Sequence, residues 1–86
     1  MEHEEKPAPS QAEIDEESRR ARRLRIAVTL ALEVIARGEM SYEEALEIVN
    51  ATRRVAVSLF PGKGETYDLL FKPKFERLMR EVYRIQ

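Results

Sequence analysis

The chain has 86 residues, no cysteine, one histidine and a formal net charge of −1. This length allows one small domain. The composition excludes disulfides and thiolate metal sites, and His3 alone cannot form an imidazole cluster. A domain of this size gains little net stability from its core, so oligomerisation is the remaining means of stabilisation. No segment approaches the roughly 20 consecutive apolar residues of a membrane span, and the acidic N-terminus is unlike a signal peptide, so we expect a cytoplasmic protein without a membrane partner.

Charge is unevenly distributed along the chain. Residues 1–18 hold seven acids against Lys6, a net charge of −6, whereas residues 19–86 hold fourteen bases against nine acids, a net charge of +5. Residues 1–9 contain two prolines and few apolar side chains, so they cannot offset the entropy that ordering would cost. We therefore expect a disordered acidic tail over residues 1–9 and a helical domain over residues 10–86.

The first helix is expected from about residue 11 to residue 37. Ser10 and Glu13 have the spacing of a capping box, and Gly38 suits the left-handed residue that follows a helix. The apolar residues of this helix fall on two stripes at helical spacing, the first being Leu24, Val28, Ala31 and Ile35, the second Ile26, Leu30 and Val34. Two stripes need more than one neighbouring helix. We therefore predict that the second stripe is an oligomer interface.

The second and third helical segments follow short connections. A second capping box, Ser41 with Glu44, predicts a helix over residues 42–60 that lies antiparallel to the first. Pro73 restricts the backbone of Lys72, so the sequence predicts separate segments over residues 65–71 and 73–85. The expected fold is all-α: a small helical bundle built on a long antiparallel helical hairpin, with a proline-broken third helical segment.

Five arginines lie close together in the first helix. They are Arg19, Arg20, Arg22, Arg23 and Arg25. Such a cluster could contact the phosphates of a nucleic acid. The alternative is a solvent-exposed helix segment in which the arginines pair with the acids one turn upstream, and no aromatic residue interleaves them to stack on bases.

Arg53 falls in the middle of the apolar face of the second helix. An inward-facing guanidinium needs a carboxylate partner, which Glu33, Glu65 or Asp68 could supply. The alternative is that Arg53 receives an anionic ligand or a carboxylate of a partner protein.

Catalytic chemistry has little support in the sequence. There is no cysteine, no histidine beyond the tail, and no serine with a nearby base, so nucleophilic catalysis lacks its components. The segment 62–66 lacks the glycine spacing of a phosphate-binding loop. We therefore expect no cofactor and no enzymatic activity. The expected function is that of a helical protein–protein interaction or oligomerisation module, and the expected assembly is a homodimer. The alternative is a nucleic-acid-binding accessory protein that uses the arginine cluster.

Overall fold

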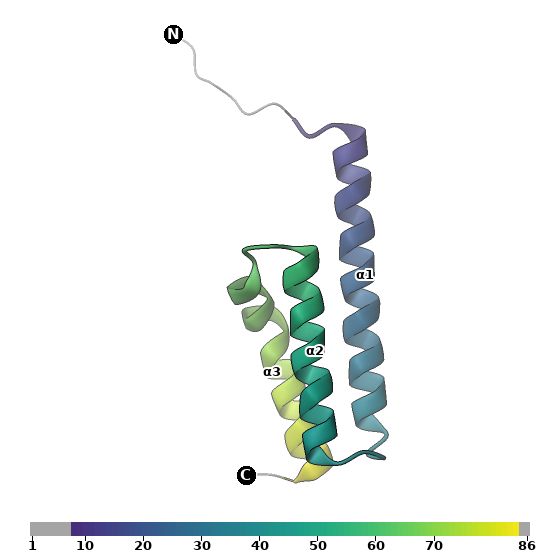
Figure 1. Ribbon diagram of the computed structural model, residues 1–86, viewed down its shortest axis with the longest axis vertical. Helices are drawn as coiled ribbons and strands as arrows, with labels where there is room; N and C mark the ends of the chain where they lie inside the picture. Colours follow the sequence, from purple (N-terminus) through teal and green to yellow (C-terminus); the bar gives the residue numbers. More distant parts are fainter. Residues whose placement is uncertain (1–7, 85–86) are drawn as a thin grey trace.

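A computed structural model describes residues 8–84, and within this range it contains three helices and no strand. The helices are α1 (Gln11–Ala36), α2 (Tyr42–Leu59) and α3 (Gly64–Tyr83), and consecutive helices run in opposite directions (Figure 1). The predicted all-α bundle is confirmed. Of the tail expected over residues 1–9, residues 1–7 lie outside the described residues, as do residues 85–86 at the other end.

Both predicted capping boxes form. The hydroxyl of Ser10 accepts a hydrogen bond from the backbone N–H of Glu13 at 3.1 Å, and the Glu13 carboxylate accepts one from the Ser10 N–H at 2.8 Å. Ser41 and Glu44 repeat this exchange at 3.1 and 2.9 Å. Each box satisfies two N–H groups that helix geometry would otherwise leave unpaired. Gly38 follows the end of α1 with φ +68°, the left-handed conformation that its sequence position predicts.

The predicted break in the third helix is wrong. α3 continues through Pro73 from Gly64 to Tyr83. Pro73 cannot donate to the carbonyl of Leu69 one turn earlier, which in a buried helix would be costly. Here Pro73 is exposed and Leu69 is 79% exposed, so water can reach the backbone where the hydrogen bond is missing. The packing of Tyr67 and Phe75 on either side of the proline holds the two halves in one helix.

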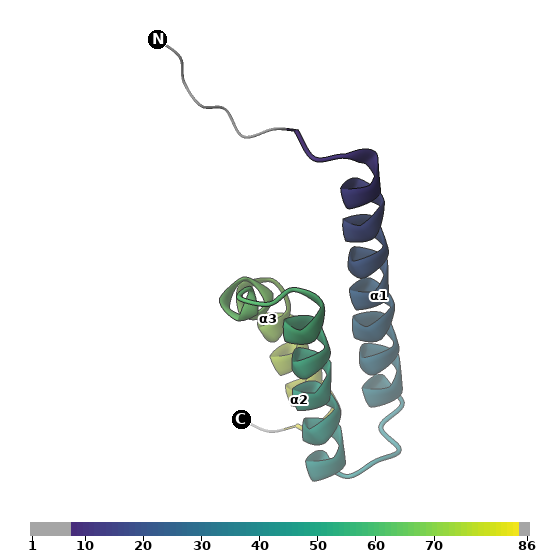
Figure 2. The same cartoon turned by 45° about the horizontal axis from the view of Figure 1, so that its top comes forward.

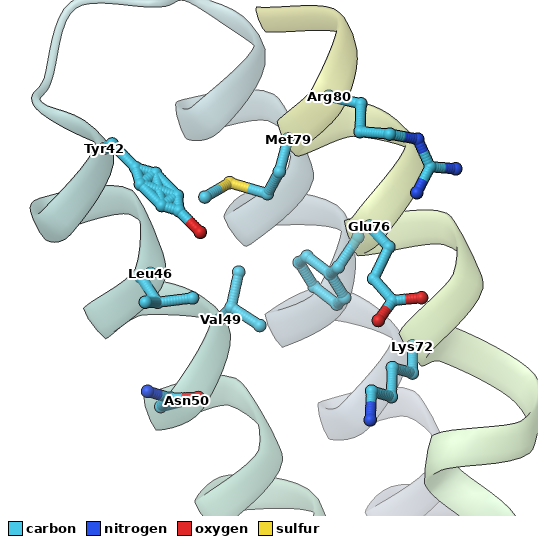
Figure 3. A pocket seen from close by; sticks show the side chains of 9 residues that line it. Tyr42, Leu46, Val49, Asn50, Lys72, Glu76, Met79 and Arg80 are labelled. Carbon is cyan, nitrogen blue, oxygen red and sulfur yellow. The ribbon is translucent and has the colours of Figure 1, made fainter. Parts of the chain in front are cut away.

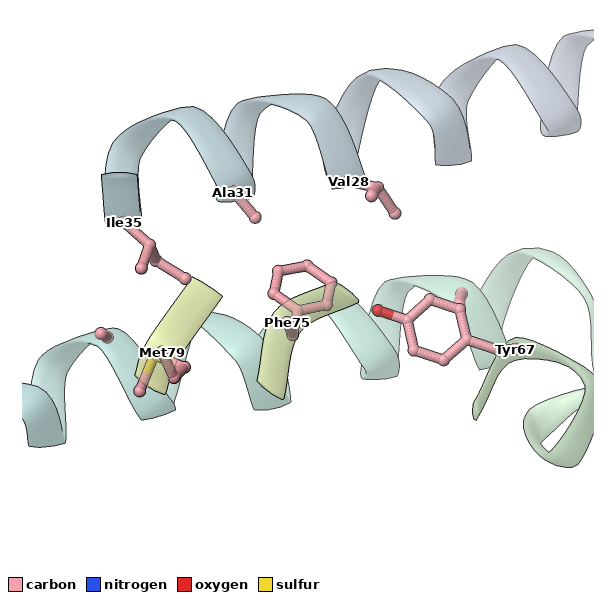
Figure 4. Close-up of a cluster of buried hydrophobic side chains, with 8 residues drawn as sticks. Val28, Ala31, Ile35, Tyr67, Phe75 and Met79 are labelled. Atoms are coloured by element: carbon pink, nitrogen blue, oxygen red, sulfur yellow. The ribbon is translucent and has the colours of Figure 1, made fainter. Parts of the chain in front are cut away.

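The core takes apolar side chains from all three helices (Figure 4). Its buried members are Val28, Ala31, Ile35, Ala45, Ala56, Tyr67, Phe75 and Met79. The alanines of α1 and α2 allow these two helices to approach closely, while the larger α3 side chains fill the space beside them. The Tyr83 hydroxyl donates to the carbonyl of Met40 at 2.9 Å, which fixes the end of α3 to the α1–α2 connection.

α1 is longer than the other two helices, and its N-terminal half extends beyond them (Figures 1 and 2). Residues 11–19 are all exposed, and the first buried residue of α1 is Val28. We call residues 11–19 the projecting segment. It is held helical by its capping box and by local side-chain pairs rather than by tertiary packing.

Candidate interaction surface on the first helix

Ile26, Leu30 and Val34 form a stripe on α1, which we call the outer stripe. Ile26 is 51% exposed, Leu30 is 56% exposed and Val34 is half-buried. At about 100° per residue, Ile26 and Leu30 lie on the side of α1 opposite Val28 and Ile35, which point into the core. Neither α2 nor α3 covers Ile26 or Leu30. The structure therefore leaves Ile26 and Leu30 accessible on the side of α1 that faces away from the core, with Val34 half-buried beside them.

Other large apolar side chains are exposed, but they are arranged differently. Val55 on α2 is 41% exposed, and Leu69 and Leu70 on α3 are 79% and 60% exposed. Leu69 and Leu70 are consecutive, so they point about 100° apart and do not form a stripe. Their exposure was not predicted, because the sequence pattern treated the start of α3 as a short separate segment.

The charges of the projecting segment are partly paired within it. Arg19 Nη2 donates to Glu16 Oε1 at 2.8 Å, and Arg20 Nη1 donates to Glu16 Oε2 at 3.3 Å. The hydrogen bond from Arg19 and its charge lower the pKa of Glu16. The pKa of Glu13 is also lowered, chiefly by the backbone N–H of Ser10. Both carboxylates are therefore ionised at neutral pH.

The arginine cluster does not form one basic face. Arg19 and Arg20 share Glu16, and the Arg20 guanidinium also lies 5.8 Å from the ring centre of Phe60. Arg22, Arg23 and Arg25 are exposed, and none of them forms an ion pair with another residue of the range 8–84. Because the helix turns by about 100° per residue, Arg22 and Arg25 lie on the same side of α1, about 60° apart, whereas Arg23 points about 100° away from Arg22. The structure thus offers three accessible cations, but not a continuous basic groove.

Arg53 binds Asp68, one of its three predicted partners. Arg53 Nε donates to Asp68 Oδ1 at 2.8 Å and Nη2 donates to Oδ2 at 3.0 Å, a two-point contact that joins α2 to α3. The Arg53 side chain is 46% exposed, so it lies at the rim of the helix contact, more accessible than the predicted inward-facing position. The hydrogen bond to Arg53 lowers the pKa of Asp68, and the same bond raises the pKa of Arg53.

Gly64 is the first residue of α3 and lies against Arg53. A Cβ atom at this position would be only 2.7 Å from Arg53 Nη2. The absence of a side chain therefore allows the guanidinium to reach over the start of α3 toward Asp68.

Tyr67 is a buried residue that the sequence reasoning missed. It is 6% exposed, and its hydroxyl has no hydrogen-bond partner among the described residues. Burial raises the pKa of Tyr67, with a further contribution from the charge of Asp68. Figure 4 shows its hydroxyl end directed toward Phe75 and Val28. Tyr67, Phe71 and Phe75 recur every fourth residue, so the pattern becomes visible once the helix is read through Pro73.

A groove of about 440 Å³ lies between α2 and α3 (Figure 3). Its apolar walls include Tyr42, Leu46 and Met79, and Lys72, Glu76 and Arg80 lie along α3 at its edge. Tyr42 packs edge-on against Tyr83, with ring centres 5.7 Å apart. The mixed charges at the edge select no particular ligand, so the groove does not identify a binding partner.

Within residues 8–84, no helix is long and apolar enough to cross a membrane, and no group of three or more histidine, cysteine, aspartate or glutamate residues could hold a metal ion. We compared the chain with models of protein families, with curated proteins and with solved structures. None of these comparisons found a match.

Proposed function

We propose that the protein is a small non-enzymatic interaction module that associates with another protein chain through the outer stripe of α1. The preferred partner is a second copy of the same protein. The observation that carries the proposal is the exposure of Ile26 and Leu30 one turn apart on a helix whose opposite side is in the core. Single exposed apolar residues are normal on a monomer, whereas aligned neighbours mark contact surfaces. The cytoplasmic location expected from the sequence is part of this proposal.

The physical gain from covering the stripe is modest. Full burial of a large aliphatic side chain is worth about 1.5–3 kcal/mol, and Ile26 and Leu30 each retain only about half of their surface for a partner to cover. Association also costs translational and rotational freedom. We therefore expect a weak, reversible complex that forms only in the upper part of the concentration range from about 1 μM to 1 mM.

Size-exclusion chromatography with light scattering tests the proposal over protein concentrations from about 1 μM to 1 mM. We expect the mass to rise with concentration from that of the 10.0 kDa monomer toward twice that value. Leu30→Arg should keep the protein monomeric, because it puts an unpaired charge into the apolar contact. The matched control is Leu70→Arg, which changes a residue of similar exposure on α3 and should leave the mass unchanged. A monomer at every concentration, or equal behaviour of the two variants, would contradict the proposal.

Nucleic-acid binding is the second candidate function. The observation that favours it is the accessibility of Arg22, Arg23 and Arg25. The distribution of these three arginines around the helix and the engagement of Arg19 and Arg20 with Glu16 favour the first candidate.

A further inference from the structure

The outer stripe continues in both directions along α1 as charged residues at helical spacing. Asp15, Arg19 and Arg22 precede Ile26 on this side of the helix. Glu33 follows it, and Arg37 is the C-cap residue directly after α1, with helical backbone angles. All five charged residues are exposed. Within residues 8–84, neither Glu33 nor Arg37 forms an ion pair.

Four of these charged residues lie at equal distances before and after Ile26, and the two residues at each distance have opposite charges. Arg19 lies seven positions before Ile26 and Glu33 lies seven positions after it. Asp15 lies eleven positions before and Arg37 eleven positions after. Seven and eleven residues are close to two and three helical turns, so each member of a pair lies on the same side of the helix as Ile26.

We infer that the partner of α1 is α1 of a second copy, packed antiparallel about a two-fold axis that passes close to Ile26. This inference rests on the proposed function, because it takes the outer stripe as the contact surface. In this arrangement Arg19 faces Glu33 of the other copy and Asp15 faces its Arg37, and symmetry makes each contact twice. A parallel pair would instead place Asp15 on Asp15, Arg19 on Arg19 and Glu33 on Glu33, which repel.

In the same register Ile26 packs against Ile26 of the other copy. Leu30 lies four positions after Ile26 and Arg22 four positions before it, so the aliphatic stem of Arg22 covers Leu30 of the other copy. The outer side of α1 points away from α2 and α3, so the two bundles lie on opposite sides of the α1 pair. The projecting segment, whose residues are all exposed, then lies along the C-terminal half of α1 in the other copy.

Cysteine cross-linking tests the orientation directly, because the chain has no cysteine of its own. Disulfides need Cα atoms about 4.4–6.8 Å apart. We expect Ile26→Cys to give a disulfide-linked dimer under mild oxidation. Arg19→Cys alone should not, because antiparallel packing separates its two copies by about 21 Å along the helix axis. A mixture of Arg19→Cys and Glu33→Cys should form the mixed dimer. Self-linking of Arg19→Cys in preference to the mixture would show a parallel pair and overturn the inference.

Charge exchange tests the ion pairs by a second route. Arg19→Glu and Glu33→Arg should each raise the dissociation constant, measured by sedimentation equilibrium at low salt, by about fivefold, since each replaces attraction with repulsion at two symmetric positions. The variant with both changes should return to within about twofold of the parent. The local Arg19–Glu16 contact is lost both in Arg19→Glu and in the double variant, so this loss cannot account for a restored affinity in the double variant.

The outcomes separate the two proposals. Dimerisation that depends on Leu30 but shows no restoration in the double variant would overturn the register and leave the proposed function intact. If Val55→Glu dissociated the dimer as strongly as the change at Leu30, the contact would include α2, and this result would also overturn the register. Both proposals would be contradicted by a protein that remains monomeric and in which Ile26→Cys forms no more cross-linked dimer than Ile26→Cys combined with Leu30→Arg. Circular dichroism should show unchanged helix content in the variants that keep Arg19, because their altered residues are exposed and make no local pair in the projecting segment. Arg19→Glu and the double variant lose the same Arg19–Glu16 pair, so their helix contents should equal each other.

Discussion

Arg53 and Asp68 are joined by two hydrogen bonds, of 2.8 and 3.0 Å, across the contact between α2 and α3. Both side chains remain partly exposed, so water screens their attraction. We expect Arg53→Ala to lower the melting temperature by no more than about 4 °C. Thermal unfolding followed by circular dichroism measures this effect, and Arg54→Ala, a change at the neighbouring exposed arginine, provides the control. A loss of more than about 15 °C would show that the pair behaves as a buried one.

The same pair predicts a dependence of stability on acid. Because Arg53 lowers the pKa of Asp68 in the folded protein, the contribution of the pair is complete above the ordinary carboxyl pKa of 3.8 and is lost as the pH falls through the lower folded value. The melting temperatures of the parent and of Arg53→Ala should therefore converge as the pH is lowered below about 4. A difference that persists at pH 2 would indicate that Arg53 stabilises by packing instead of charge.

Gly64→Ala should change stability differently in two backgrounds. Alanine is favoured over glycine by about 1 kcal/mol inside a helix and by less at the first residue, where Gly64 lies, but the alanine Cβ would displace the Arg53 guanidinium from its present position. We expect Gly64→Ala to be neutral or destabilising in the parent and stabilising in the Arg53→Ala background. Urea unfolding of the four proteins of this cycle gives the coupling. Equal effects in the two backgrounds would show that the close approach has no energetic consequence.

Much of this fold is readable from local sequence signals. Ser10 with Glu13 and Ser41 with Glu44 predict both helix starts, and Gly38 predicts the end of α1, because capping depends on residues close in sequence. The continuity of α3 through Pro73 and the choice of Asp68 by Arg53 depend on tertiary packing, which propensity rules do not contain. The outer stripe is readable as an apolar pattern, but its accessibility follows only from where α2 and α3 lie.

Replacing Tyr67 by phenylalanine should not destabilise the protein. The buried hydroxyl has no hydrogen-bond partner among the described residues, so its removal relieves a desolvation cost of about 1–3 kcal/mol while keeping the ring that packs in the core. Chemical denaturation at pH 7 should show Tyr67→Phe to be as stable as the parent or more so. A clear loss of stability would mean that the hydroxyl makes a favourable contact.

High pH provides an independent readout of Tyr67. The pKa of Tyr67 in the folded protein is raised above the ordinary value of 10.0. Below pH 10.0 its ionisation therefore does not affect stability, and as the pH rises from there through the folded pKa the protein loses stability. The parent should therefore lose more stability than Tyr67→Phe between pH 9 and pH 11. Parallel curves would contradict the raised pKa, and Tyr42→Phe serves as a control at a half-buried tyrosine.

Pro73→Ala should stabilise α3. The substitution restores an N–H that can donate to the Leu69 carbonyl and removes the clash of the proline ring with that carbonyl. Because both residues are exposed, water already offsets part of the cost, so we expect a gain of about 1–2 kcal/mol rather than the full penalty of roughly 3 kcal/mol. Urea unfolding measures the gain. Destabilisation would indicate that the proline sets a bend on which the packing of Phe75 depends.

Salt dependence distinguishes the arginine cluster as a nucleic-acid site from the cluster as an exposed helix segment. We expect weak binding to a generic duplex, with an affinity that falls about 40-fold between 50 and 200 mM salt, because about three free guanidiniums release about three counterions. Replacing Arg22, Arg23 and Arg25 by glutamine should weaken this binding no more than replacing Arg54, Arg77 and Arg80, a control of equal charge on α2 and α3. Fluorescence anisotropy measures both. Tight binding at 150 mM salt that is lost only in the first triple variant would make nucleic-acid binding the preferred function, because only a specific arrangement of the cluster survives such screening.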